Sequence, residues 1–271
     1  MHSTVRWSTR VVGVALGLSV VAALPMGAAW SAASEQPSSH MATSSPTSAA
    51  GSTSTEAPDD LASARYRWGD VVAGDEFNYT GAPDSSKWRV YRSRGHAGKG
   101  LRSPDAWRVD GTAATITGDS QGRTGGMSSR YGQKTGRWEA RMKVSLRDPK
   151  YHPVLLLWPD MPTDNCPEVN FAESLKDRNK VNFFLHYGCE PRQVQTAKSL
   201  DMTTWHNYAV EWTPTSMTGY IDGVRYFEND NRKYLPKVSM HACIQLDWMP
   251  NDSDTRKTTM TVDWIRVYKA S

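Results

Sequence analysis

Between Trp68 and the C-terminus the sequence consists of short segments in which apolar and polar residues alternate. They are rich in Val, Ile, Tyr, Phe, Trp and Thr and are bounded by Gly, Pro, Asn or Asp, as is typical of strands and turns. Between these segments there is no long stretch with the apolar periodicity of a helix, and strands and helices do not alternate as in βαβ units. The pattern predicts an all-β fold, a β-sandwich of antiparallel strands. The clearest segments are residues 113–119, 137–146, 181–188, 206–212, 241–248 and 260–268.

The N-terminal part has a different composition, which predicts export. A positively charged start precedes the apolar run Val11–Leu24, and small residues follow it up to Ala33, as in a bacterial secretory signal peptide. Because a membrane span needs about 20 apolar residues, we expect cleavage of residues 1–33 rather than a retained anchor, and no stable membrane insertion afterwards. The expected location is extracellular or cell-wall associated.

Residues 34–62 are dominated by Ser, Thr, Pro, Ala and Gly and contain no large aromatic residue. Such a segment cannot bury enough apolar surface to offset its ordering entropy, so it predicts a disordered linker. Residues 63–271 then form one domain of ordinary size, which we expect to be monomeric. This domain is mildly basic but lacks a basic cluster interleaved with aromatic residues, so no nucleic-acid partner is expected.

The stretch PEVNFAE, Pro167–Glu173, carries two glutamates five positions apart. In a regular strand Glu168 and Glu173 would point to opposite faces. One extra residue near Phe171 or Ala172 would form a β-bulge and bring Glu168, Asn170 and Glu173 to the same face. The two carboxyl groups could then approach the separation of about 5 to 5.5 Å that retaining glycosidases use.

At this point the sequence resembles glycoside hydrolase family 16, the laminarinase, lichenase and agarase group. EVNFAE matches the family signature E-x-D-x-x-E except at its centre, and segments along nearly the whole domain are similar to family strands. The resemblance implies a jelly-roll sandwich of the concanavalin A-like kind, with two antiparallel sheets and a concave substrate cleft. Residues 95–104 and 241–250 are similar to an actinobacterial branch. The matching segments are residues 75–88, 127–144, 205–223 and 260–268.

The resemblance also implies roles for the residues of PEVNFAE. Glu168 takes the nucleophile position and Glu173 the general acid/base position of a retaining, double-displacement mechanism. Asn170 stands where the family has Asp. Its amide can still donate a hydrogen bond to Glu168, and the lost negative charge should lower the repulsion between the carboxylates. We expect a shifted pH optimum or a slower enzyme.

Further candidates for substrate binding come from strands near the glutamates. His186 lies on the strand expected to face Glu168, and Trp158 lies one strand upstream, where it could stack on a sugar ring or pack in the core. Gln245 and Asp247 share a face of an apolar strand, which suggests that this face lines the cleft. The segments that line the family's cleft add Trp138, Trp205 and Trp248.

Three cysteines allow one disulfide in an exported protein. Cys166 and Cys189 are nearly equidistant from the expected turn near residues 176–178, so folding of the hairpin predicts a Cys166–Cys189 bond and leaves Cys243 as a buried thiol. Catalysis requires no cofactor. The resemblance implies a structural Ca²⁺, for which Asp263 matches one ligand position.

The leading hypothesis is a secreted, endo-acting, retaining β-glycosidase that hydrolyses a β-linked polysaccharide, β-1,3-glucan or a related polymer. One alternative is a non-catalytic or impaired carbohydrate-binding protein on the same fold, suggested by Asn170. Another is a transglycosylase that remodels the cell envelope, suggested by the signal and spacer. The loops at residues 92–107 and 145–154 are expected to set the substrate.

Overall fold

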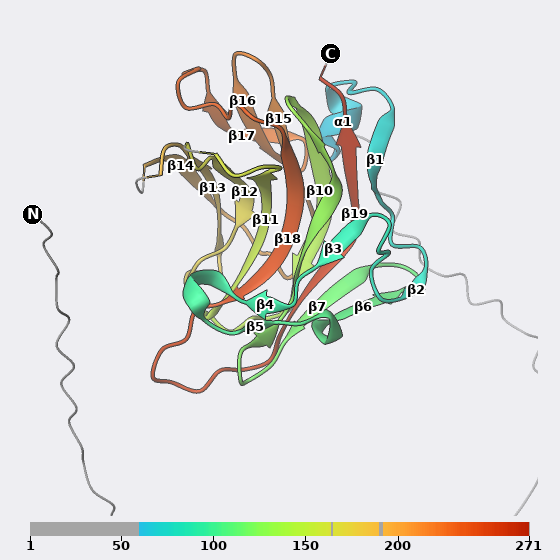
Figure 1. Ribbon diagram of the computed structural model, residues 1–271, viewed down its shortest axis with the longest axis vertical. Coiled ribbons are helices and arrows are strands. Elements are labelled where there is room, and N and C mark those ends of the chain that lie inside the picture. Colours follow the sequence, from blue (N-terminus) through green and yellow to red (C-terminus); the bar gives the residue numbers. More distant parts are fainter. Residues whose placement is uncertain (1–59, 164, 190–191, 271) are drawn as a thin grey trace, which may run out of the picture. The chain divides into compact units, whose positions relative to one another are not determined.

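The computed structural model describes residues 60–163, 165–189 and 192–270 (Figure 1). These residues form two large antiparallel sheets and a small three-stranded sheet, which confirms the predicted sandwich. The predicted signal peptide, and the predicted linker up to residue 59, lie outside the described residues. Helix α1 (Ala62–Arg65) begins one residue before the domain start that the sequence predicts. No helix among the described residues has the length and hydropathy of a membrane span.

The nine-stranded sheet is built from both halves of the domain. Strand β1 (Val71–Asp75) pairs with β19, outside the linear order of the others. In spatial order the remaining strands are β17 (Val224–Asn229), β16 (Met217–Ile221), β15 (His206–Trp212), β10 (Gly136–Val144), β19 (Thr258–Tyr268), β7 (Ala114–Gly118), β6 (Trp107–Asp110) and β2 (Thr80–Gly81).

The seven-stranded sheet lies against it and curves around the left side of Figure 1. Its spatial order is β14 (Gln193–Ser199), β13 (Lys180–His186), β12 (Glu168–Glu173), β11 (Tyr151–Pro159), β18 (Met240–Trp248), β9 (Gly126–Gln133) and β3 (Trp88–Val90). The small sheet contains β4 (Ser93–Arg94), β5 (Leu101–Arg102) and β8 (Arg123–Thr124), and short 3₁₀ turns cover His96–Gly98 and Pro104–Ala106.

The core lies between the two large sheets and follows from alternation along their strands. In β10 the inward side chains Trp138, Ala140 and Met142 are fully buried, and in β11 Leu155 and Leu157 meet them from the opposite sheet. Their neighbours along each strand point outward, since successive side chains of a strand face opposite sides. The outward face of the seven-stranded sheet is therefore available for a binding site.

Strand β12 contains the predicted bulge. Along β11, Leu155 pairs with Ala172 and Leu156 with Asn170, so Phe171 has no partner in the register. Both Phe171 and Ala172 are fully buried in the core. Two successive core-facing residues reverse the alternation, which places Asn170 and the residue after Ala172 on the same outer face.

A second bulge, in β17 of the other sheet, supports the first one. There Gly219 pairs with Phe227 and Tyr220 with Arg225, which leaves Tyr226 as the extra residue. The Tyr226 hydroxyl donates a 2.6 Å hydrogen bond to the carbonyl of Phe171. A bulge leaves backbone groups outside the ladder, and burying such a group without a partner is unfavourable. The bond from Tyr226 therefore stabilises the backbone between the two glutamates.

The predicted pairing of the cysteines is confirmed, and a tight hairpin turn lies in the other large sheet. Cys166 and Cys189 form a disulfide, with their Cα atoms 4.9 Å apart, and Cys243 is a buried free thiol. Asp222 and Gly223 connect β16 to β17 with φ values of 49° and 68°. Positive φ at both central residues is the geometry of a tight hairpin turn.

The start of the domain is attached to the outer face of the nine-stranded sheet. The fully buried Glu139 of β10 accepts hydrogen bonds from the backbone amides of Ala62 and Ser63, at 2.6 and 3.2 Å. Trp68 then packs edge-on against Tyr268. This attachment lies on the face of the sandwich opposite the outer face of the seven-stranded sheet.

Replacing Tyr226 by Phe tests the link between the bulges. Tyr226→Phe leaves the Phe171 carbonyl without its partner, so we expect the free energy of unfolding to fall by about 1–3 kcal/mol. Urea denaturation measures it. Tyr131→Phe is the matched control, because among the described residues the Tyr131 hydroxyl bonds only the partly exposed side chain of Gln133. We expect a change below about 0.5 kcal/mol. Equal losses in the two variants would contradict this account.

Candidate active site

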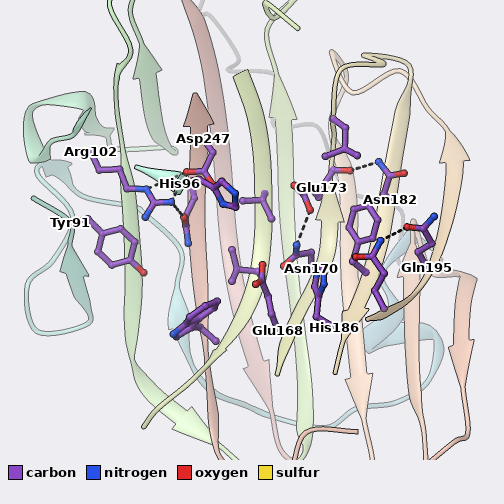
Figure 2. Close-up of a pocket in the computed structure, with 17 residues that line it drawn as sticks. Tyr91, His96, Arg102, Glu168, Asn170, Glu173, Asn182, His186, Gln195 and Asp247 are labelled. Carbon is purple, nitrogen blue, oxygen red and sulfur yellow. Dashed lines mark hydrogen bonds and ion pairs between the residues drawn. The ribbon is translucent and has the colours of Figure 1, made fainter. Parts of the chain in front are cut away.

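A cleft of about 720 Å³ lies on the outer face of the seven-stranded sheet (Figure 2). Its floor comes from the outward positions of β11, β12, β13, β14 and β18, and its far wall from the segment between β3 and β5. The lining residues are Tyr91, His96, Arg102, Val154, Leu156, Trp158, Glu168, Asn170, Glu173, Leu175, Asn182, Phe184, His186, Gln193, Gln195, Gln245 and Asp247.

Both glutamates and Asn170 reach this cleft, as the bulge predicts. Figure 2 shows Glu168 and Glu173 on either side of Asn170 along β12. The Asn170 amide nitrogen donates a 2.8 Å hydrogen bond to Glu173 Oε2, rather than to Glu168 as the sequence suggested. That prediction was wrong because the bulge carries the Glu173 carboxylate to the Asn170 amide. Asn170 is 4% exposed, and its Oδ1 has no hydrogen-bond partner within the described part of the chain.

The environment of Glu173 favours the protonated form. Burial raises the pKa of its carboxyl from 4.5 to about 7, although the hydrogen bond from Asn170 lowers it. The negative charges of Glu168 and Asp247 raise it further. A carboxyl group with a pKa near 7 can donate a proton and later take one up at neutral pH, which suits general acid/base chemistry.

Neighbouring side chains provide surfaces for a polar, ring-shaped ligand. His186 pairs with Glu168 in the register, as expected, and lines the cleft. Trp158 also lines it and is 47% exposed, so its ring is open for stacking. The Asn182 amide donates to the Glu173 carbonyl at 3.0 Å. The roles of His186 and Trp158 toward a ligand stay predictions.

Gln245 and Asp247 face the cleft together, and both contact a residue that the sequence did not single out. Arg102 donates to Asp247 Oδ1 from Nη2 at 2.6 Å and from Nε at 3.2 Å, and it also bonds Gln245 Oε1. Arg102 and His96 belong to the loop at residues 92–107, which the sequence indicated as specificity-determining. Their partners could not be read from the sequence, because the loop is 143 residues from Gln245.

Residues 99–266 match the model of the family described as "Glycosyl hydrolases family 16". The chain belongs to this family. Its sandwich is the family's jelly roll. No curated protein sequence matches the chain at a significant level.

Solved structures agree on the fold. LamAcat from Zobellia galactanivorans has a TM-score of 0.66 at 15% identity, covering 75% of this chain and 99% of that one. The catalytic domain of an endo-1,3-beta-glucanase (laminarinase) from Thermotoga petrophila RKU-1 has a TM-score of 0.66 at 18% identity. The match covers 74% of this chain and 98% of that one. A laminarinase from Rhodothermus marinus has a TM-score of 0.64 at 21% identity, and the match covers 74% of this chain and 97% of that one. At these identities the likeness concerns the fold alone.

Three tryptophans that the family resemblance pointed to lie outside the cleft of this family 16 protein. Trp138 is fully buried and stacks on Trp212 in the core, because its strand belongs to the other sheet and it occupies an inward position. Trp205 lies beneath Arg141 and Lys143, which are outward residues of that same sheet. The prediction that Trp138 and Trp205 line the cleft was wrong.

Trp248 also does not line the cleft. It follows Asp247 in β18, so alternation turns it to the opposite face. There its ring packs so closely on Gly122 that an added Cβ would come within 2.3 Å of it, and its indole nitrogen donates to Thr255 at 3.2 Å. Trp248 thus packs against the segments that lead into the small sheet.

The proposed calcium ligand Asp263 forms an ion pair with Arg141 at 2.8 Å. No group of three or more His, Cys, Asp or Glu residues suited to a metal ion occurs among the residues that the structure describes. The calcium site stays a prediction.

The raised pKa of Glu173 makes a prediction about stability. Because folding raises this pKa from 4.5 to about 7, the folded state binds the proton more tightly than the unfolded chain. The contribution of Glu173 to stability is thus fully present below pH 4.5 and is lost as the pH rises through about 7. Glu173→Gln removes this titration. We expect the wild type to lose about 1–3 kcal/mol more of its free energy of unfolding between pH 5 and pH 8 than Glu173→Gln loses.

Urea denaturation of both proteins at pH 5 and pH 8 measures this difference. Glu76→Gln serves as the control, because Glu76 is an exposed residue whose carboxylate pairs with Arg266 away from the cleft. If the wild type and Glu173→Gln lose stability equally between pH 5 and pH 8, Glu173 does not carry the raised pKa.

Proposed function

We propose that this protein is a secreted, endo-acting, retaining β-glycanase, with Glu168 as the nucleophile and Glu173 as the general acid/base. The observation that carries the proposal is the bulge, which directs two glutamates five positions apart into one cleft. A retaining glycosidase needs one carboxylate to attack and a second carboxyl group that holds a proton near neutral pH. The raised pKa of Glu173 supports the second role.

In the first step the Glu168 carboxylate attacks the anomeric carbon of the sugar bound over β12. A covalent bond forms between Glu168 and the sugar as the glycosidic C–O bond breaks, and Glu173 gives its proton to the departing oxygen. The amide of Asn170 holds the resulting Glu173 carboxylate through the 2.8 Å hydrogen bond.

In the second step a water molecule replaces the departed sugar. Glu173, now ionised, removes a proton from this water, whose oxygen attacks the anomeric carbon while the bond to Glu168 breaks. Two inversions leave the product with the configuration of the substrate. Both catalytic residues return to their starting protonation states, so the cycle needs no cofactor.

The substrate that we propose is β-1,3-glucan or a related β-glycan. The support comes from solved structures of the same fold whose descriptions include a laminarinase and a non-specific endo-beta-1,3(4)-glucanase. The cleft has polar side chains on its β13–β14 side, where Asn182, Gln193 and Gln195 could bind sugar hydroxyls, and Trp158 is open for ring stacking.

Action outside the cell is part of the proposal. The apolar run Val11–Leu24 and its flanking residues have the composition of an export signal. The disulfide between Cys166 and Cys189 supports it, because such bonds form and persist in oxidising compartments.

Removal of the nucleophile tests the mechanism. Glu168→Gln keeps the shape of the side chain but cannot form the covalent intermediate, so we expect reducing-end release from β-glycans to fall at least about a thousandfold. Glu76→Gln is the matched control and should retain the wild-type rate. Equal rates for Glu168→Gln and the wild type would exclude this mechanism. A wild type that binds β-glycans and hydrolyses none would identify a carbohydrate-binding protein instead.

Restoring the family's aspartate tests the part played by Asn170. Asn170→Asp places a further negative charge at the position that now donates to Glu173, and a like charge raises the pKa of its neighbour. The alkaline limb of the kcat/KM profile, which reports loss of the proton from Glu173, should move up by about one pH unit.

Gln195→Glu is the control for Asn170→Asp, because it adds the same charge at the far end of the cleft shown in Figure 2. Its effect on the alkaline limb should be clearly smaller. If the kcat/KM profile of Asn170→Asp equals that of the wild type, the alkaline limb does not report the ionisation of Glu173.

A further inference from the structure

One end of the cleft is occupied by a cluster of side chains that the mechanism does not use. Tyr91, Arg102, Gln245 and Asp247 form this group, which we call the cleft-end cluster. All four line the cleft, and Figure 2 shows Tyr91 and Arg102 at the opposite end from Gln195. They come from three separate parts of the chain, after β3, in β5 and in β18.

Arg102 is held firmly in this cluster. Its guanidinium bonds the carboxylate of Asp247 and the amide oxygen of Gln245, and its side chain is 15% exposed. Within the described part of the chain, its Nη1 makes no hydrogen bond. A guanidinium has five N–H donors in a fixed plane, so Arg102 retains donors for a ligand hydroxyl.

Tyr91 covers the floor of the sheet next to Arg102. Its hydroxyl donates to the sulfur of Cys243 at 3.4 Å, and the guanidinium of Arg102 lies 5.5 Å from its ring centroid. The ring rests on Gly126 of β9, where an added Cβ would approach it to 2.6 Å. Ser128, the next outward position of β9, is 5% exposed. The floor over β9 is thus filled by protein.

The backbone beneath this cluster is held by contacts of its own. The loop between β4 and β5 passes over the ring of Trp248, which lies 3.4 Å from the Cβ position of Gly100. Strand β5 pairs with β8 through Leu101 and Arg102. Arg102 is therefore fixed by its own backbone ladder as well as by its side-chain contacts.

The distance between this cluster and the glutamates can be counted in strands. In the strand register Glu173 pairs with Val154, Val154 with Gln245 and Gln245 with Gly126, so Gln245 lies two strands and the Tyr91 ring three strands from Glu173. Strands lie about 4.8 Å apart, so the free floor between them spans about 10–14 Å. One pyranose ring of a β-glycan extends about one strand spacing or slightly more, so about two rings fit.

We propose that the cleft-end cluster closes the cleft on the β9 side, so that this side binds about two sugar rings, with Arg102 and Asp247 bonding hydroxyls of the outer ring. A longer chain has to leave the floor at Tyr91. This inference rests on the proposed function, because it takes a β-glycan as the ligand. It adds a limit on the number of rings that contribute to affinity.

Binding of a length series tests the proposal without hydrolysis. The probes are β-1,3-linked gluco-oligosaccharides of increasing length, and the parent protein is the full chain with Glu173→Gln. Calorimetry gives Kd for each length in the parent and in variants that add Tyr91→Ala, Tyr91→Phe or Arg102→Ala. Thermal unfolding checks that each variant is folded.

In the parent and in Tyr91→Phe, which keeps the ring, we expect Kd to fall with increasing oligosaccharide length up to a limiting length and to stay constant beyond it. In Tyr91→Ala the next longer oligosaccharide should bind about threefold or more tighter than that length. Arg102→Ala should weaken binding of the oligosaccharides that reach the plateau and leave the shortest ones unchanged. If Tyr91→Ala does not fold, the Arg102→Ala comparison alone decides.

Three results would overturn the inference: the same length dependence in Tyr91→Ala and Tyr91→Phe, an Arg102→Ala effect that is equal at every length, or no binding of any probe. If the probes bind with the expected plateau but the wild type hydrolyses no β-glycan, the proposed function is contradicted. The inference that the cleft-end cluster closes the cleft would still hold.

Discussion

The bulge in β12 determines which side chains of this strand reach the cleft. Without it, Glu168 and Glu173 would lie on opposite faces of the sheet, one in the cleft and one in the apolar core. With it, Phe171 and Ala172 both enter the core and both carboxyl groups reach the same cleft. The backbone at this point is bonded by Tyr226, which is itself the extra residue of a bulge in the opposite sheet. The geometry of β12 thus depends on the packing of the two sheets together.

The charges in the cleft follow from the same arrangement. Burial raises the pKa of Glu173 most, the amide of Asn170 lowers it, and the charges of Glu168 and Asp247 raise it further. Arg102 neutralises Asp247 directly, and neither Asn170 nor Gln245 adds a charge. A cleft with a carboxylate at position 170 as well would hold more negative charge beside Glu173. Asn170 instead supplies a donor, and this keeps Glu173 oriented and its pKa close to neutral.

Local patterns predicted much of the fold and the centre of the site. Alternation identified the strands, the five-residue spacing identified the bulge, and hairpin symmetry identified the partners Cys166 and Cys189. These features involve residues that are close along the chain. Alternation also assigned Gln245 and Asp247 to one face correctly, and the same rule applied to Trp248 places it on the other face, away from the cleft. The errors at Trp138 and Trp205 arose because family segments were assigned to the cleft before the sheet containing each strand was known.

The sequence by itself therefore determined the strands, the family signature and the two glutamates, because strand periodicity and short spacings are local properties of a chain. Tertiary structure alone decided three matters: that Asn170 bonds Glu173, that Tyr226 supports the bulge from the opposite sheet, and that Arg102 and Tyr91 fill one end of the cleft. The last two join residues 55 and 143 positions apart. Such contacts depend on which strands become neighbours and on where bulges redirect side chains, and neither is encoded by the alternation of any one strand.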